Sequence, residues 1–288
     1  MVVTLYEEVR AALRETNFRP RKSRGQNFLI HERVIDSIIR LLDLSPADEV
    51  VEIGPGLGFL TRRLLERAAR VWAVEVDAAL VERLGASVFA ADPKLRLIHG
   101  DILEVPLGDM LPDKKLKLVG NLPYSISTPV LFRIFALREH FSSLVLMVQK
   151  EVADRIAAQP GTKTFGTLSV WCQIHGRIID RVSVSPEAFF PRPKVRSTVL
   201  KIELFPEPLV TASEIPILRG LVRAAFGQRR KTLGNALTAW LKSDGSEIET
   251  LLQSQGIDPR RRGETLSIDE FIKLARAAHS QSALAADH

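Results

Sequence analysis

The sequence predicts an α/β protein in which a mostly parallel sheet, covered by helices on both faces, is followed by a small all-helical C-terminal domain. Three observations predict this fold. Short β-branched runs alternate with helical stretches between Asp48 and about Phe205 of the 288-residue chain. These runs are continuously apolar, which is typical of strands buried on both faces. Beyond residue 205 only helical patterns occur, so we expect one domain at 1–206 and a helical domain at 207–288.

Five apolar runs predict the parallel strands, and they are separated by segments of helical periodicity. The runs are EVVEIG at 49–54, VWAVEV at 71–76, LRLIHG at 95–100, LKLVG at 116–120 and SLVLMVQ at 143–149. Right-handed crossover connections between such strands place ligands outside their carboxyl ends.

Two further runs, RVSVS at 181–185 and STVLKIELF at 197–205, flank a proline-rich loop. They predict an antiparallel hairpin at the edge of the sheet. The helical domain is predicted from four later segments with helical spacing. These segments are 215–227, 231–241, 247–255 and 268–278.

Composition excludes several classes of protein. A content of 45% hydrophobic and 26% charged residues is ordinary globular usage, and no apolar stretch is long enough to span a membrane. A single cysteine, Cys172, excludes an internal disulfide framework. The N-terminus lacks the apolar core of a secretory signal, so we expect a cytoplasmic protein. A formal net charge of +6 is compatible with a polyanionic partner.

The sharpest local feature is VEIGPGLGFLT at 51–61, where a strand runs into Gly54, Gly56 and Gly58 before a helix. Glycine allows a tight turn and a close approach of a ligand to the backbone. The spacing differs from the G-x-G-x-x-G of dinucleotide-binding proteins. Alternatively, the glycines only form a tight connection between the strand and the helix, and no ligand binds there.

Acidic residues follow the next two strands. Glu75 ends the second strand, 21 residues after Gly54, where a carboxylate can accept both hydroxyls of a ribose. Asp101 follows the third strand, where it can accept from the amino group of an adenine. Either residue can instead cap the following helix. Together with the glycine turn, the two carboxylates suit an adenosine.

The fourth strand delivers Asn121-Leu122-Pro123-Tyr124. The proline restricts the residue before it, which makes a rigid polar elbow. The amino group of adenine is a poor nucleophile because its lone pair is delocalised into the ring. Two acceptors facing its hydrogens, the Asn121 side-chain oxygen and the Leu122 carbonyl, would free that lone pair, and Tyr124 would stack on the base. An Asn-Pro turn with a surface tyrosine is the alternative.

These motifs resemble those of the S-adenosylmethionine-dependent rRNA adenine N6-dimethyltransferases. The resemblance adds RGQNFLI at 24–30, FFPRPKVRS at 189–197 and FGQRRKTLGNAL at 226–237 to the glycine turn and the elbow, in the family's order. It implies a Rossmann-like class I methyltransferase sheet with an N-terminal segment that covers S-adenosyl-L-methionine. Within the family, the C-terminal domain and FGQRRKTL favour the small-subunit (16S) enzyme, which dimethylates two adjacent adenines in the 3′-terminal hairpin and is linked to ribosome biogenesis.

The resemblance also implies roles for individual residues. Asn121, Leu122, Tyr124 and Phe189 would be catalytic, with Tyr124 and Phe189 enclosing the flipped adenine. The cofactor would contact Asn27, Leu29, Gly54, Gly56, Glu75, Asp101 and Asn121. No metal is expected, because the six histidines form no ligand pattern.

Basic residues cluster before the fold, along the proline-rich loop and at the start of a C-terminal helix. We expect backbone contacts to RNA from Arg24, Arg192, Lys194, Arg229, Arg230 and Lys231. The expected partner is small-subunit rRNA or a pre-30S particle, and the family resemblance suggests a monomer.

Other functions remain open at this point. One alternative is dimethylation of a different RNA adenine, as in the large-subunit resistance enzymes, and another is a largely non-catalytic ribosome assembly factor. A nicotinamide-dependent dehydrogenase would also use a glycine turn and an acidic second strand. It would give the elbow at Asn121 no role.

Overall fold

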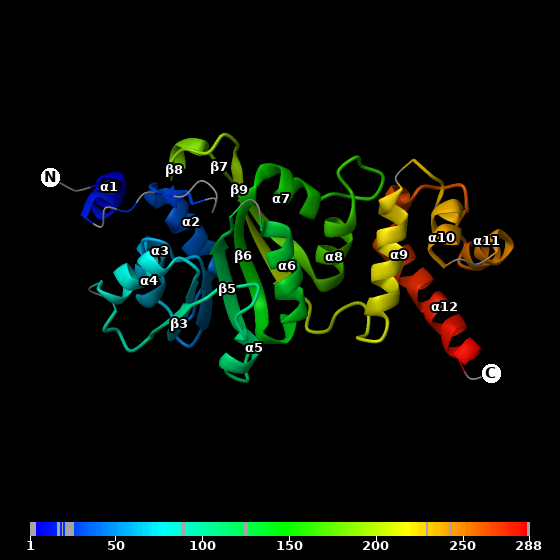
Figure 1. Cartoon of the computed structure of the whole chain (residues 1–288), viewed down its shortest axis with the longest axis horizontal. Helices are drawn as coiled ribbons and strands as arrows, with labels where there is room; N and C mark the ends of the chain where they lie inside the picture. The colour runs from blue at the N-terminus through cyan, green and yellow to red at the C-terminus, as the bar shows by residue number, and fades with distance from the viewer. Residues whose placement is uncertain are drawn as a thin grey trace. The chain divides into compact units, whose positions relative to one another are not determined.

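The computed structural model describes residues 4–15, 18, 20, 26–87, 90–123, 126–228, 230–241 and 244–286 (Figure 1). The chain divides into two compact units. The first comprises residues 1–153 and 177–204, and the second comprises residues 154–176 and 205–288.

The first unit is built on a sheet that, within the described residues, has seven strands in the order β4-β3-β2-β5-β6-β9-β7. The strands are β2 (Glu49–Ile53), β3 (Arg70–Glu75), β4 (Leu95–His99), β5 (Leu116–Asn121), β6 (Phe141–Gln149), β7 (Gly176–Val184) and β9 (Ser197–Leu204). Strands β2 to β6 pair in parallel, and β9 pairs antiparallel with β6. The predicted α/β class, with a mostly parallel sheet and an antiparallel edge, is therefore confirmed.

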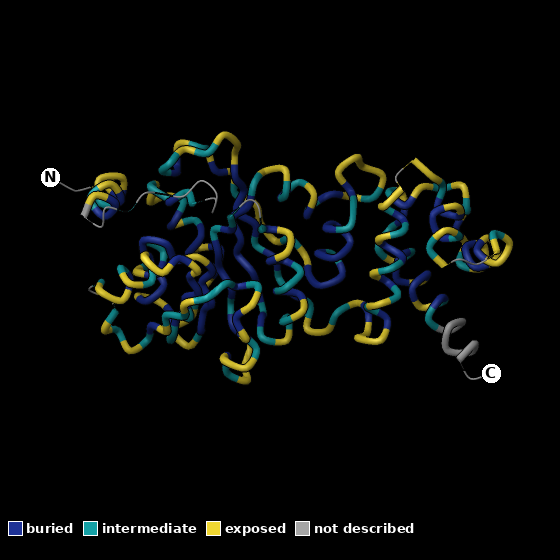
Figure 2. The backbone as a smooth tube through the Cα atoms, viewed as in Figure 1, coloured by how far each residue is buried: buried dark blue, intermediate teal, exposed yellow. Residues whose placement is uncertain are grey.

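The central strands form the core of this unit. All five residues of β2 are buried, and Leu118, Leu144 and Val145 of the neighbouring strands are at most 1% exposed (Figure 2). Strands that are covered on both faces have no solvent-facing side, which is why these segments read as continuous apolar runs.

The helices of this unit connect and cover the strands. They are α1 (Leu5–Glu15), α2 (Glu32–Leu42), α3 (Phe59–Leu65), α4 (Ala78–Gly85), α5 (Leu107–Met110), α6 (Ser127–Ala136) and α7 (Lys150–Ile156), the last of which runs into the second unit. Helix α2 packs against β6 and β9, α3 against β3, and α4 against β3 and β4. On α2, Ile35, Ile38, Ile39 and Leu42 lie on one face and are buried, as their helical spacing predicts.

A second, two-stranded sheet joins two motifs that are far apart in the sequence. Strand β1 (Phe28–Leu29) pairs antiparallel with β8 (Phe189–Phe190), with Phe28 opposite Phe190 and Leu29 opposite Phe189. The N-terminal segment and the proline-rich loop are thereby held side by side. Strands of two residues are too short to be read from a sequence pattern.

The second unit is helical. It contains α8 (Thr167–His175), α9 (Ile215–Gly227), α10 (Leu233–Leu241), α11 (Gly245–Ser254) and α12 (Ile268–Ala286). This unit differs from the helical domain predicted at 207–288, because residues 154–176 also belong to it. Helix α8 packs against α9 and α12, and Phe165 meets Phe226 edge-on at 5.8 Å, so this insertion supplies part of the helical core.

Cys172 lies within α8 and is 2% exposed, and burial raises the pKa of its thiol.

Of the helices in the described part of the chain, none combines the length and the apolarity needed to cross a bilayer.

Candidate functional site

A cavity opens at the carboxyl ends of four adjacent strands of the first unit. Its wall is formed by the turn after β2, by Glu75 at the end of β3, by Asp101 after β4 and by Asn121 at the end of β5, and β1 adds a further side. The structure brings together on this wall every residue predicted to contact the cofactor. These are Asn27, Leu29, Gly54, Gly56, Glu75, Asp101 and Asn121.

The glycine turn presents backbone to the cavity. Gly54, Gly56 and Gly58 have φ angles of 68°, 60° and 84°, which a residue with a side chain adopts only under strain. A Cβ at Gly54 would meet nothing within 4 Å, so the space beside it is open, whereas a Cβ at Gly56 would lie 3.1 Å from the Phe28 ring. The Gly54 amide donates to the Val74 carbonyl at 2.9 Å, which ties the turn to β3.

Glu75 is 5% exposed, and its carboxylate holds the turn in place. Oε2 accepts a hydrogen bond from the Gly56 amide at 3.1 Å, and Oε1 accepts one from the Asp77 amide at 3.0 Å. Burial raises the pKa of Glu75, although these backbone donors oppose the change. The Val76 amide also lowers the pKa of Glu75, and because a carboxylate accepts about four hydrogen bonds, capacity for a further donor remains. The cap of α4 is Asp77, whose Oδ1 accepts from the Ala79 amide at 3.2 Å.

Asp101 is half-buried and begins the turn after β4. Its Oδ1 accepts from the Leu103 amide at 2.9 Å, and its carbonyl accepts from the Glu104 amide at 2.9 Å. One carboxylate oxygen of Asp101 therefore caps this turn, as the alternative interpretation of the sequence allowed. The residue nevertheless lines the cavity.

Glu52 also lines the cavity, and sequence reasoning missed it. It is 1% exposed and accepts a hydrogen bond from the Thr61 hydroxyl at 2.7 Å. Burial raises its pKa to about 8, and the nearby negative charge of Glu75 acts in the same direction. The available signal was an acidic residue inside the otherwise apolar run EVVEI of β2.

Hydrogen bonds hold the first two residues of the elbow after β5. The Asn121 side-chain nitrogen donates to the Asn27 carbonyl at 3.0 Å, so the amide is held by the N-terminal segment and its Oδ1 is left as an acceptor. The Leu122 amide donates to the Met147 carbonyl at 3.0 Å, and the Leu122 side chain is 1% exposed. Only the backbone of Leu122 can therefore act on a ligand. Tyr124 lies outside the described residues.

Phe189 lies elsewhere than the predicted stacking role requires. It is 3% exposed, belongs to the hydrophobic core behind β8, and is not part of the cavity wall among the described residues. A base would reach its ring only if neighbouring side chains moved. This residue was assigned from its motif, and the motif does not show which side of β8 faces the cavity.

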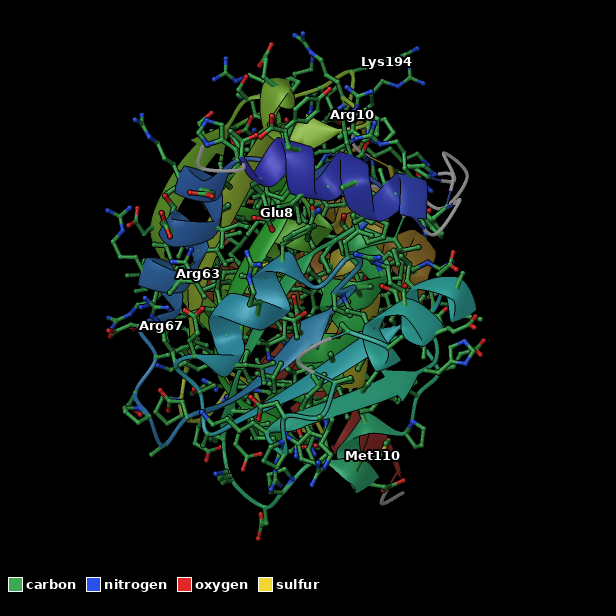
Figure 3. All side chains as sticks on the ribbon, turned by 90° about the vertical axis from the view of Figure 1, so that its left-hand side faces the viewer. Glu8, Arg10, Arg63, Arg67, Met110 and Lys194 are labelled. Atoms are coloured by element: carbon green, nitrogen blue, oxygen red, sulfur yellow. The ribbon has the colours of Figure 1, made fainter. Side chains whose placement is uncertain are left out.

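The predicted RNA-contacting residues that the structure describes are exposed. Arg192 forms an ion pair with Glu187, and Lys194 projects from the same loop (Figure 3). Arg230 and Lys231 are exposed before α10 in the second unit. Arg24 and Arg229 lie outside the described residues. Across the described ranges, no group of three or more His, Cys, Asp or Glu side chains is placed to hold a metal ion.

Comparison with protein families identifies related sequences. Residues 17–279 match the model of the family described as ribosomal RNA adenine dimethylase. The ribosomal RNA small subunit methyltransferase A of Geobacter metallireducens is 46% identical over 269 residues, which is 92% of this chain and 98% of that protein. The protein of the same name from Syntrophotalea carbinolica is 47% identical over 262 residues, covering 90% and 97%.

Two solved structures share the fold. A dimethyladenosine transferase from Plasmodium falciparum matches with a TM-score of 0.77 and 24% identity, over 88% of this chain and 98% of that one. The 23S rRNA methyltransferase ErmE matches with a TM-score of 0.66 and 22% identity, over 87% and 99%. At this identity the likeness extends to the fold alone.

Proposed function

Because this chain belongs to the ribosomal RNA adenine dimethylase family, we propose that it dimethylates N6 of two adjacent adenines in the 3′-terminal hairpin of small-subunit rRNA, with S-adenosylmethionine as the methyl donor. One observation carries the proposal. The glycine turn, Glu75, Asp101 and the Asn121 elbow surround one cavity at the carboxyl ends of four neighbouring strands. We further propose a monomer that acts on a pre-30S particle.

The cavity fits S-adenosylmethionine. The turn at Gly54 has open space where a side chain would stand, so backbone can approach the methionine portion. Glu75 would accept from the ribose hydroxyls with its remaining capacity, and Asp101 would accept from the adenine amino group. Leu29 of β1 and Asn27, which directly precedes β1, would cover the bound molecule. When bound, S-adenosylmethionine supplies an electrophilic methyl group on a sulfonium.

The elbow would prepare the target amine for attack. Asn121 Oδ1 and the Leu122 carbonyl would accept the two N6 hydrogens, which favours a pyramidal nitrogen with its lone pair directed at the methyl. The hydrogen bond to the Asn27 carbonyl orients the Asn121 side chain, and the hydrogen bond from the Leu122 amide to the Met147 carbonyl anchors the backbone that carries the second acceptor. Positioning of this kind supplies much of the rate acceleration in bimolecular transfers.

The adenine must leave its stack to reach the elbow, which costs a few kcal/mol. Stacking on Tyr124 would offset part of this cost, since an aromatic–base contact contributes about 1–3 kcal/mol. A second contact with Phe189 requires the β1–β8 wall to open. We assign the phosphate contacts to the basic residues of the proline-rich loop and of the start of α10.

Among the RNA targets considered, the small subunit is favoured by the names of the relatives that are 46% and 47% identical. A non-catalytic assembly factor would not need the Asn121 side chain to be oriented by a hydrogen bond to the Asn27 carbonyl. A dehydrogenase would leave the elbow without a role.

The proposed function is tested with small subunits purified from cells that lack this methylation. They are incubated with the enzyme and labelled S-adenosylmethionine, and the modified nucleosides are mapped by mass spectrometry. We expect dimethyladenosine at two adjacent positions of the 3′-terminal hairpin. Label in large-subunit rRNA, or no label in any RNA, would contradict the proposal.

A further inference from the structure

Helix α1 lies outside the region that defines the family, because the family match begins at residue 17. It is nevertheless packed onto the first unit. Leu5, Val9, Ala12 and Leu13 recur at helical spacing and are each at most 8% exposed. This apolar stripe fixes one face of α1 against the protein. The opposite face of α1 is therefore exposed to solvent in a fixed orientation.

That open face carries an aromatic–arginine pair. Tyr6 is 39% exposed, a high value for a tyrosine in a helix whose apolar stripe is buried. The Arg10 guanidinium lies 5.6 Å from the centre of the Tyr6 ring, and its Nη1 donates to the Tyr6 hydroxyl at 3.5 Å. Arg10 itself is exposed (Figure 3). Exposed aromatic rings beside arginines are the surfaces on which unpaired bases stack.

The pair is joined to the wall of the candidate site. The Tyr6 ring meets the Phe190 ring edge-on, with centroids 6.3 Å apart. Phe190 pairs in register with Phe28 in the β1–β8 sheet, and Phe28 lines the cavity. The Tyr6 ring therefore contacts a residue of β8 whose partner in β1 lines the cavity. The proline-rich loop with Arg192 and Lys194 continues directly from Phe190.

Two exposed arginines on α1 can attract the phosphates of a nucleic acid. Of its acidic residues, Glu7 accepts from the Thr4 amide at 2.8 Å and from the Thr4 hydroxyl at 2.9 Å, which caps the helix. Glu8 pairs with Arg62 at 3.4 Å. The Glu7 and Glu8 carboxylates are thus engaged in local contacts, Glu15 is the third acidic residue of α1, and Arg10 and Arg14 are exposed. Phosphates are attracted to exposed arginines of this kind.

We propose that Tyr6 and Arg10 form an accessory RNA-binding surface, on which an unpaired nucleotide flanking the target adenine stacks while its phosphate pairs with Arg10. The inference rests on the proposed function. It adds a contact that the family-defining region does not contain, and it makes α1 a determinant of substrate affinity.

The alternative is that Tyr6 only clamps α1 onto Phe190, and two variants separate these roles. Tyr6→Leu keeps an apolar contact with Phe190 but removes the ring, and Tyr6→Phe keeps the ring. The probe is the 3′-terminal small-subunit hairpin as a synthetic RNA, with 2-aminopurine placed in turn at each unpaired position beside the target adenines. Fluorescence anisotropy gives the RNA affinity, 2-aminopurine quenching reports stacking, and the Tm and the cofactor affinity report the fold.

We expect wild type and Tyr6→Phe to quench 2-aminopurine at one flanking position. Tyr6→Leu should lose this quenching and bind RNA about tenfold more weakly, the scale of one lost stack, with unchanged Tm and cofactor affinity. Arg10→Gln should lower the dependence of log affinity on log salt by about 0.7, the value for one single-strand phosphate contact. The control Arg67→Gln, an exposed arginine away from α1 in Figure 3, should leave this slope unchanged.

RNA binding and quenching by Tyr6→Leu at the wild-type level would overturn the inference. So would a loss of binding by Tyr6→Leu that is matched by a fall in Tm, because the role would then be structural. Methyl transfer by the wild-type enzyme to small subunits is measured separately. If that transfer occurs and Tyr6→Leu behaves as wild type, the accessory surface is wrong and the proposed function stands. If no transfer occurs, the proposed function fails.

Discussion

Replacement of the buried Glu52 by glutamine is expected to remove much of the pH dependence of stability of the first unit. Glutamine has nearly the same shape as a protonated glutamate and can still accept from the Thr61 hydroxyl, which lies 2.7 Å from Glu52 in the native protein. Glu52→Gln therefore removes the ionisable carboxyl group while it preserves the packing around it.

The magnitude follows from the pKa of Glu52, which burial raises from 4.5 to about 8. Between these pH values the folded protein retains a proton that the unfolded chain releases. The stability associated with Glu52 is therefore fully present below pH 4.5 and is lost as the pH rises through about 8. Over the whole interval the loss amounts to about 5 kcal/mol, at about 1.4 kcal/mol for each pH unit. Glu52→Gln should recover most of it at the upper end.

The assay is urea-induced unfolding followed by circular dichroism, for both proteins, at several pH values between 4.5 and about 8. At the lower end the two free energies of unfolding should agree within about 1–2 kcal/mol, because the amide carries one hydrogen more than the carboxyl group and that hydrogen requires a partner. At the upper end the variant should be the more stable protein.

Glu49 on the same strand provides a matched control of opposite sign. Burial disfavours its charge, but hydrogen bonds from Trp72 at 2.8 Å and Lys114 at 3.0 Å outweigh burial and hold the pKa of Glu49 below its ordinary value. The stability that it contributes is present above pH 4.5 and is lost as the pH falls, so Glu49→Gln should destabilise the protein at the upper end. Parallel pH profiles of wild type and Glu52→Gln would refute the reasoning on Glu52.

Three further variants test the site and the proposed RNA contacts. Asn121→Ala should lower kcat at least about 100-fold, as removal of one oriented polar group does, with RNA binding preserved; near-normal turnover would exclude the amine-orienting role. Glu75→Ala should weaken cofactor binding about 10- to 100-fold by calorimetry, since unpaired ribose hydroxyls cost about 1–3 kcal/mol, and unchanged affinity would contradict ribose binding. Joint replacement of Arg230 and Lys231 by glutamine should reduce the salt slope of RNA binding by about 0.7–0.9 per lost contact, and an identical slope would remove them from the interface.

Much of the fold was predictable because its strands are encoded locally. Each of the five parallel strands is a continuous apolar run, and each predicted run overlaps an observed strand. The edge strands predicted at 181–185 and 197–205 overlap β7 and β9, although β7 begins earlier, at Gly176. The pattern does not show that β9, the later of the two, lies between β6 and β7. Strand order depends on which edges meet in space.

The chemical groups of the site could likewise be predicted from short stretches of sequence. Carboxyl ends of parallel strands meet at one edge of a sheet, so Gly54, Glu75, Asp101 and Asn121 were expected together, and the structure places them around one cavity. Glu52 was missed because strand periodicity gives no measure of burial for a single polar side chain. Only the packed structure shows that Glu52 is 1% exposed beside Glu75.

By itself the sequence determined the class of fold, the strand tips that bear functional groups and the basic character of the loops, since each follows from short stretches of residues. The tertiary structure alone decided three things. It paired β1 with β8, it assigned residues 154–176 to the helical unit, and it buried Phe189 while it left Tyr6 exposed on α1. Each of these outcomes depends on contacts between residues that are distant in the chain, and such contacts are selected by the packing of the whole unit rather than by any local pattern.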